Sequence, residues 1–190
     1  MEGSHHIYGK RGRIERISEM PNMRNEGGSM SDRRVLVTGA GGFVGGHLVA
    51  SLRSQGYTEI RAVDAKPFDQ WYQGFTDVDN RRLDLTQATA CRGAARGVDE
   101  IYNLASDMGG MGFIENNKAR CMLSVLVNTH MLMAARDVGV QKYFFASSAC
   151  VYAADKQTSP DVTALKEADA YPAMPEDGYG WEKLFGERMC

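Results

Sequence analysis

The chain has 190 residues, 43% of them hydrophobic and 24% charged, and its formal net charge is −2. That length suffices for one domain with a sizeable core but not for two full ones, and the near-neutral charge argues against a nucleic-acid-binding protein. No apolar run approaches the ~20 residues that span a bilayer, which argues against a membrane protein. The four cysteines form no CxxC pair, so we expect no metal site and no disulfide framework, but reduced thiols in a cytoplasmic protein.

The segment 1–32 differs in composition from the rest of the chain. It is rich in Gly, Arg, Glu, Asn and Met and contains few aliphatic side chains. Such a segment cannot bury enough apolar surface to fold, so we interpret it as a disordered leader, a vector remnant or an upstream extension. We therefore predict one folded domain over residues 33–190.

From Arg34 onward, short apolar segments alternate with segments of helical periodicity. The expected strands cover residues 35–38, 59–64, 81–85, 100–105 and 142–147. The expected helices cover residues 43–55, 86–96 and 116–138, and a last one begins near residue 179. Strands that alternate with helices are typical of βαβ units, so the predicted fold is α/β, with a doubly wound, mostly parallel sheet of the Rossmann type.

A glycine cluster stands where the first expected strand meets the first expected helix. Gly39 allows a tight turn, Gly42 lets the backbone approach a pyrophosphate, and Gly45 lets the helix pack on the strand. Asp64 ends the second strand, where a carboxylate binds ribose hydroxyls and repels a 2′-phosphate. This arrangement predicts a dinucleotide site rather than a turn without a ligand. Asp64 favours NAD over NADP, although two nearby cations, Arg61 and Lys66, argue the other way.

A tyrosine and a lysine stand four positions apart in the last expected helix, so Tyr179 and Lys183 share one helical face. An ammonium beside a phenol lowers the pKa of the phenol, because it favours the phenolate. The phenol can then accept the proton of a hydroxyl while hydride leaves the same carbon. Ser148, after the fifth expected strand, can hold the reacting oxygen. These residue types predict hydride transfer at a carbinol carbon.

Three further features leave alternatives open. Cys150 is either a small buried hydrophobe or, near the cationic lysine, a partly ionised base that moves a carbon-bound proton. Asp84 either meets the adenine amino group or is a plain surface residue. Residues 108–113, rich in Met and Gly, form either a close-approach wall of the site or an ordinary loop. A thiol that moves protons beside a hydride site would suit inversion of a centre next to the oxidised carbon.

The motifs resemble those of a known family. Thr38-Gly-Ala-Gly-Gly-Phe-Val-Gly45, Asp64 and the pair Tyr179-x-x-x-Lys183 are similar to those of extended short-chain dehydrogenase/reductases. Segments 107–114 and 146–152, together with 165–169 and 175–179, resemble the GDP-mannose 3,5-epimerase family in particular. The resemblance covers residues 34–190.

Carried over by position, the resemblance implies a set of ligand contacts. NAD would be bound by Gly39, Gly42, Phe43, Val44, Gly45, Asp64, Asp84, Tyr179 and Lys183, and the sugar nucleotide by Gly109, Ser148, Ala149 and Cys150. The resemblance further implies that Tyr179, supported by Lys183, oxidises the C4 hydroxyl of GDP-mannose. Cys150 and a second acid would then exchange protons at C3 and C5. The products would be GDP-L-galactose, on the branch toward ascorbate in plants, or GDP-L-gulose, and the enzyme would be a homodimer.

The chain also departs from that family. There the second acid/base is a lysine well beyond the Tyr-x-x-x-Lys motif, and this chain ends seven residues after Lys183. We therefore expect an N-terminal portion, truncated before the last strands and the substrate domain and inactive by itself. Two alternatives remain: another NAD-dependent nucleotide-sugar epimerase or dehydratase, and a non-catalytic NAD-binding module.

Overall fold

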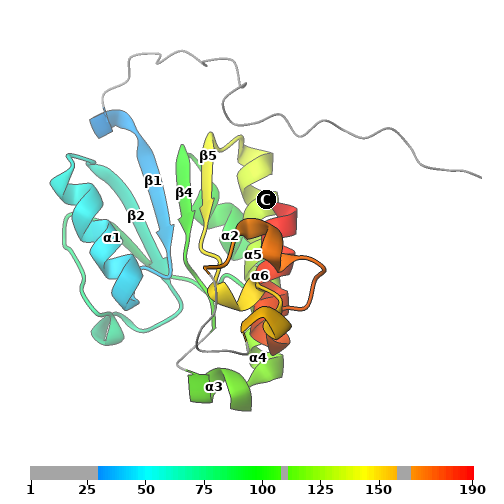
Figure 1. Ribbon diagram of the computed structural model, residues 1–190. Helices are drawn as coiled ribbons and strands as arrows, with labels where there is room; N and C mark the ends of the chain where they lie inside the picture. The colour runs from blue at the N-terminus through cyan, green and yellow to red at the C-terminus, as the bar shows by residue number, and fades with distance from the viewer. Residues whose placement is uncertain (1–29, 108–110, 158–163) are drawn as a thin grey trace, which may run out of the picture.

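The computed structural model describes residues 30–107, 111–157 and 164–190 (Figure 1). Strands and helices alternate along this part of the chain, as the sequence predicts. The strands are β1 (Arg34–Thr38), β2 (Glu59–Asp64), β3 (Asp79–Arg82), β4 (Glu100–Asn103) and β5 (Lys142–Phe145). The α-helices are α1 (Phe43–Ser54), α2 (Ala88–Ala95), α3 (Met111–Asn116), α4 (Lys118–Met122), α5 (Ser124–Val138) and α6 (Asp177–Met189). Short 3-10 turns include η2 (Met30–Asp32), η3 (Phe68–Gln70) and η4 (Ala149–Val151).

The five strands form one parallel sheet in the order β3-β2-β1-β4-β5. The chain builds outward from β1 in one direction through β2 and β3, then returns to continue through β4 and β5 on the other side. This confirms the doubly wound fold. The strand order reverses between β1 and β4, and ligands of such sheets bind beyond the carboxyl ends of the strands at that point. Here those ends are Thr38 and Asn103, which are paired in register.

The core lies on both faces of the sheet, because the strands are covered on both sides. Leu36 of β1 packs with buried residues of α2 and α5, including Met131. Val35 and Val37 point the other way and pack with Val49 and other residues of α1. Figure 1 shows the same division, with α1 on one face and α2, α5 and α6 on the other.

Several element bounds differ from the sequence prediction. Strand β3 covers Asp79–Arg82 rather than residues 81–85, and β4 and β5 end two residues early. Helix α2 begins at Ala88, because Asp84 accepts hydrogen bonds from the backbone N–H and hydroxyl of Thr86 and holds that segment in a turn. The long helix expected over residues 116–138 is divided into α4 and α5 at Leu123, whose backbone stays in the right-handed helical region. The last helix begins at Asp177.

Candidate active site

The glycine cluster forms a tight turn at the end of β1. Gly39 has φ +67°, a left-handed conformation that a side chain strains, and a Cβ there would stand 2.9 Å from the Leu104 carbonyl oxygen. The N–H of Gly42 donates to the Gly39 carbonyl over 3.1 Å. A Cβ on Gly45 would lie only 2.2 Å from that same oxygen. The turn and the first turn of α1 therefore pack together only because both Gly39 and Gly45 lack side chains.

The N-terminus of α1 is open to an anion. Gly42, its N-cap, provides no side-chain cap, so the first N–H groups of this 12-residue helix are left for a ligand. Phe43 and Val44, the first two residues of α1, are 61% and 66% exposed. Unpaired N–H groups at a helix N-terminus are suited to bind a pyrophosphate.

Asp64 ties the end of β2 to the glycine turn. Its Oδ2 accepts from the N–H of Gly41 over 2.9 Å and its Oδ1 from the N–H of Lys66 over 3.0 Å. These bonds hold the carboxylate beside the glycines, where the sequence predicts a contact with ribose.

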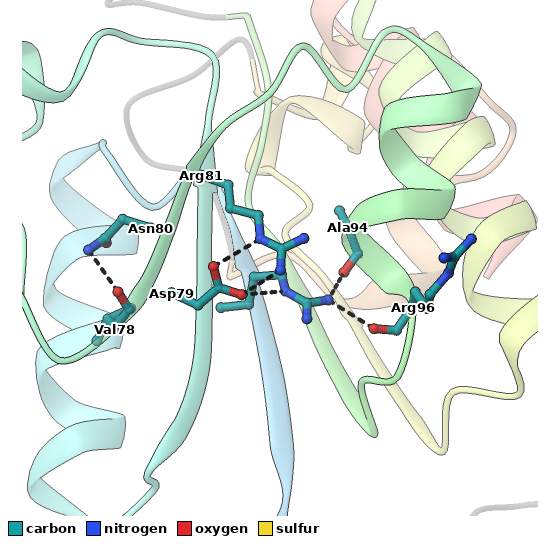
Figure 2. Close-up of polar contacts among 7 residues, drawn as sticks. Val78, Asp79, Asn80, Arg81, Ala94 and Arg96 are labelled. Carbon is teal, nitrogen blue, oxygen red and sulfur yellow. Dashed lines mark hydrogen bonds and ion pairs between the residues drawn. The ribbon is translucent and has the colours of Figure 1, made fainter.

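Arg61 faces away from this site, which removes one argument for NADP. Its guanidinium donates to Asp79 over 2.9 Å and to the carbonyls of Ala94 and Arg96, over 2.6 and 3.0 Å, at the end of α2. Figure 2 shows these partners, with Arg81 on the same Asp79 carboxylate. Hydrogen bonds from Arg81 and then Arg61 oppose burial and keep the pKa of Asp79 below its usual value. The hydrogen bonds of Arg61 therefore join β2 to β3 and to the end of α2.

Asp84 is exposed and engaged in the turn with Thr86, whose side-chain hydrogen bond lowers the pKa of the carboxyl. The hydrogen bonds in this turn explain the position of the Asp84 carboxylate without a ligand, so the contact of Asp84 with adenine stays a prediction.

Aromatic side chains cover the glycine turn, a feature that was not predicted from the sequence. The N–H of Tyr72 donates to the Gly41 carbonyl over 2.9 Å, and a Cβ on Gly41 would meet the Trp71 ring at 2.8 Å. The ring of Phe43 lies 4.9 Å from that of Tyr72 between centroids. The clustering of Phe68, Trp71, Tyr72 and Phe75 in an otherwise polar stretch was the available signal.

Tyr179 and Lys183 lie on one buried face of α6, as their spacing predicts. They are 5% and 3% exposed, and the Lys183 Nζ is 5.6 Å from the centroid of the Tyr179 ring and 4.9 Å from that of Phe145. Burial foremost raises the pKa of Tyr179 and a hydrogen bond with Ser148 opposes this rise, so the phenol does not have the lowered pKa that the sequence predicts. Burial lowers the pKa of Lys183, and the charge of Glu182 opposes that fall.

Ser148 and Cys150 reach the same place from the end of β5. Ser148 caps η4, and its hydroxyl accepts from the N–H of Cys150 over 3.2 Å. The N–H of Glu176 donates to the Cys150 carbonyl over 3.0 Å, which attaches α6 to η4. The structure thus brings together Ser148, Cys150 and Tyr179, with the exposed Ala149 beside them. Gly109 lies outside the described residues.

Cys150 differs from one expectation. Burial foremost, and then a hydrogen bond with Glu176, raise the pKa of its thiol, while Ser148 lowers it. A raised pKa argues against the partly ionised base that the sequence allows beside a cation.

Two buried polar residues near Lys183 also escaped the sequence analysis, namely Asn128 of α5 and Glu182 of α6. Across the described residues, no group of His, Cys, Asp and Glu side chains could hold a metal ion. Within the same residues, every helix is too short or too polar to cross a membrane.

The chain is similar to known proteins over most of its length. The model of the NAD dependent epimerase/dehydratase family matches residues 35–190. The chain is 43% identical over 158 residues to GDP-mannose 3,5-epimerase 1 of Oryza sativa subsp. japonica, and 39% identical over 158 residues to GDP-mannose 3,5-epimerase of Arabidopsis thaliana. Both matches cover 83% of this chain, which spans 41% and 42% of those proteins. These similarities confirm the resemblance drawn from the motifs.

A solved structure is similar as well. A short-chain dehydrogenase/reductase superfamily protein from Agrobacterium tumefaciens, with bound NAD, matches at a TM-score of 0.67 and 30% identity. The match covers 83% of this chain and 44% of that one. The chain thus corresponds to about two fifths of the length of the relatives and structure that it matches.

Proposed function

This chain belongs to the NAD dependent epimerase/dehydratase family, and from that membership we propose that it is the NAD-binding part of an enzyme that epimerises GDP-mannose. One observation carries the proposal. Attachment of α6 to η4 brings a phenol, a hydroxyl and a thiol to one place, at Tyr179, Ser148 and Cys150. Hydride chemistry alone needs the first two, whereas the thiol adds a group for a carbon-bound proton. The relatives in rice and Arabidopsis are named for this epimerisation.

In the proposed reaction, Tyr179 accepts the proton of the sugar C4 hydroxyl, and Ser148 holds the oxygen. NAD, held by the glycine turn and Asp64, would supply the acceptor for the hydride from C4. The 4-keto group then acidifies the protons on C3 and C5. A second acid/base outside these residues would remove one of these protons, and the Cys150 thiol, whose pKa burial raises, would donate a proton to the carbon from the opposite face. Return of the hydride to C4 and of the Tyr179 proton to its oxygen would then give GDP-L-galactose or, after inversion at C5 alone, GDP-L-gulose.

We place the remaining parts of the reaction outside these residues. By family resemblance we assign the second acid/base and the substrate domain to the part of the relatives that these 190 residues do not span. By the same resemblance we propose a homodimer that acts in the cytoplasm on the route to ascorbate. The free thiols of Cys91, Cys121, Cys150 and Cys190 suit a reducing compartment.

Two rival functions are distinguishable. A nucleotide-sugar 4-epimerase requires no group that moves a carbon-bound proton, so substitution of Cys150 would leave it active. A non-catalytic NAD-binding module would bind NAD and be indifferent to both Cys150 and Tyr179.

Deuterium uptake from heavy water tests the proposal. In the longer enzyme, GDP-mannose is expected to gain deuterium at C3 and C5. Cys150→Ser is expected to suppress inversion at C3 and C5 while keeping oxidation at C4, whereas Tyr179→Phe abolishes oxidation, exchange and inversion. Undiminished inversion in Cys150→Ser would overturn the assignment. For the 190-residue chain the corresponding measurement is thermal unfolding, in which NAD is expected to raise the midpoint.

A further inference from the structure

A row of buried polar side chains crosses the domain from the end of β1 to α6. The Thr38 hydroxyl donates to Asn103 Oδ1 over 2.7 Å, the Asn103 amide donates to Asn128 Oδ1 over 2.9 Å, and the Asn128 amide donates to Glu182 Oε1. All four residues are at most 1% exposed. The row therefore joins four elements, β1, β4, α5 and α6, inside the protein and away from water.

The direction of this row is fixed at its start. Two backbone N–H groups just after β4 donate to the Thr38 oxygen, each over 3.2 Å, so the Thr38 hydroxyl proton is left to go to Asn103. That bond makes the Asn103 oxygen the acceptor and its NH₂ the donor to Asn128, and the same reasoning orients Asn128. Glu182 consequently accepts a hydrogen bond from the Asn128 amide. Hydrogen bonds donated to a carboxyl group favour its ionised form.

The second oxygen of Glu182 faces a cation. Glu182 Oε2 is buried and has no hydrogen-bond partner among the described residues. The Lys183 Nζ lies 3.9 Å from it, and the two side chains are 0% and 4% exposed. Burial raises the pKa of Glu182 and lowers the pKa of Lys183, while the charge of each opposes the effect of burial on the other. An isolated charge at this depth is costly, so neither group is expected to be charged without the other.

The other titratable groups around this pair do not replace Glu182. Tyr179 of α6 and Cys121 of α4 feel the charge of Glu182, burial foremost raises the pKa of both, and neither of them is a carboxylate. From β5 the neighbour is the ring of Phe145. Within the described residues, Glu182 is the carboxylate whose charge supports the Lys183 ammonium.

We propose that Glu182 is a positioning residue for Lys183: the Thr38–Asn103–Asn128 row keeps the Glu182 carboxylate ionised, and that carboxylate keeps the buried lysine cationic. A cationic Lys183 beside Tyr179 then favours the phenolate. This last step rests on the proposed function. The charge states of Glu182 and Lys183 do not depend on it.

Nuclear magnetic resonance of the whole 190-residue chain tests the charge states. With ¹³C-labelled glutamate, the wild-type Glu182 carboxyl carbon is expected at its ionised position at pH 7. With ¹³C-labelled lysine, Glu182→Gln is expected to lower the Lys183 titration midpoint by about one to three pH units. Lys183→Arg assigns the lysine signal. Glu59→Gln, which removes the same charge from an exposed site on β2, is expected to change nothing.

Either of two results would overturn the proposal: an unchanged Lys183 midpoint in folded Glu182→Gln, or a protonated Glu182 at pH 7 in the wild type. The wild-type spectrum decides the matter even where the variant does not fold. A lowered midpoint with no deuterium uptake by GDP-mannose in the longer enzyme would overturn the proposed function and leave the pairing intact. Deuterium uptake with an unchanged midpoint would do the reverse.

Discussion

The carbonyl oxygen of Cys150 occupies the space that a side chain on Gly180 would need. A Cβ at Gly180 would stand 2.3 Å from that oxygen and 3.1 Å from the Pro175 side chain. Because α6 carries Tyr179 and η4 carries Cys150, this close approach sets how near the phenol lies to the thiol.

Gly180→Ala is expected to push α6 away from η4. The clash is with backbone, which cannot rotate aside, so we expect a loss of about 1–3 kcal/mol in the free energy of unfolding, measured with denaturant. The control is Gly93→Ala on α2, where no described atom lies within 4 Å of the new methyl group. This control is expected to gain up to about 1 kcal/mol, because alanine favours a helix. Equal stability of the two variants would contradict the predicted contact.

Arg61→Ala is expected to lower stability without changing cofactor preference. It removes hydrogen bonds to Asp79 and to the end of α2, at an expected cost of about 1–3 kcal/mol. The ratio of NAD to NADP affinity, measured by calorimetry, should stay as in the wild type. Asp64→Ala is expected to reduce that ratio, because it removes the charge that repels a 2′-phosphate. A change of preference in Arg61→Ala would place its guanidinium at the cofactor.

Trp71 is expected to report NAD binding by fluorescence. Its ring lies against Gly41 in the turn that fits the pyrophosphate, whereas Trp181, the other tryptophan, is 47% exposed on α6. Trp181→Phe should keep the NAD-dependent change in emission, and Trp71→Phe should lose it. The opposite pattern would indicate that NAD binds away from the glycine turn.

Glu176→Gln is expected to make the Cys150 thiol more reactive. The hydrogen bond and the charge of Glu176 raise the pKa of the thiol, so their loss lowers it and increases the thiolate fraction at a given pH. Alkylation of Cys150, followed by mass spectrometry of its peptide, should accelerate at pH 8, and its pH midpoint should move downward. Glu167→Gln, an exposed change in another turn, serves as the control. Slower alkylation in Glu176→Gln would show that Glu176 does not raise the pKa of the Cys150 thiol.

The sequence revealed features that depend on neighbours in the chain. Gly39, Gly45 and Asp64 were recognisable because a strand, a turn and a helix follow one another locally. Tyr179 and Lys183 were recognisable because helical geometry alone puts them on one face. The turn at Asp84 was not recognisable from the sequence, because a short polar residue before a helix is equally common at a strand end, in a helix cap and in a turn.

The buried row could not be read from the sequence, because its members meet only after folding. Asn103 and Asn128 are 25 positions apart, and Asn128 and Glu182 are 54 positions apart. A single Asn or Glu in an amphipathic segment is an ordinary surface residue by composition. The cover provided by Trp71 and Tyr72 was hidden for the same reason, since its partner Gly41 lies in another element.

The fixed direction of the row also ranks the parts of the domain by how easily they open. Detachment of α6 breaks only the last bond, to Glu182, and leaves Thr38, Asn103 and Asn128 joined. Separation of β1 from β4 removes the bond that orients every later amide, and it exposes the sheet centre as well. Amide protons of α6 are therefore expected to exchange with solvent through a smaller opening than those of β1 and β4, which exchange only when the whole domain unfolds.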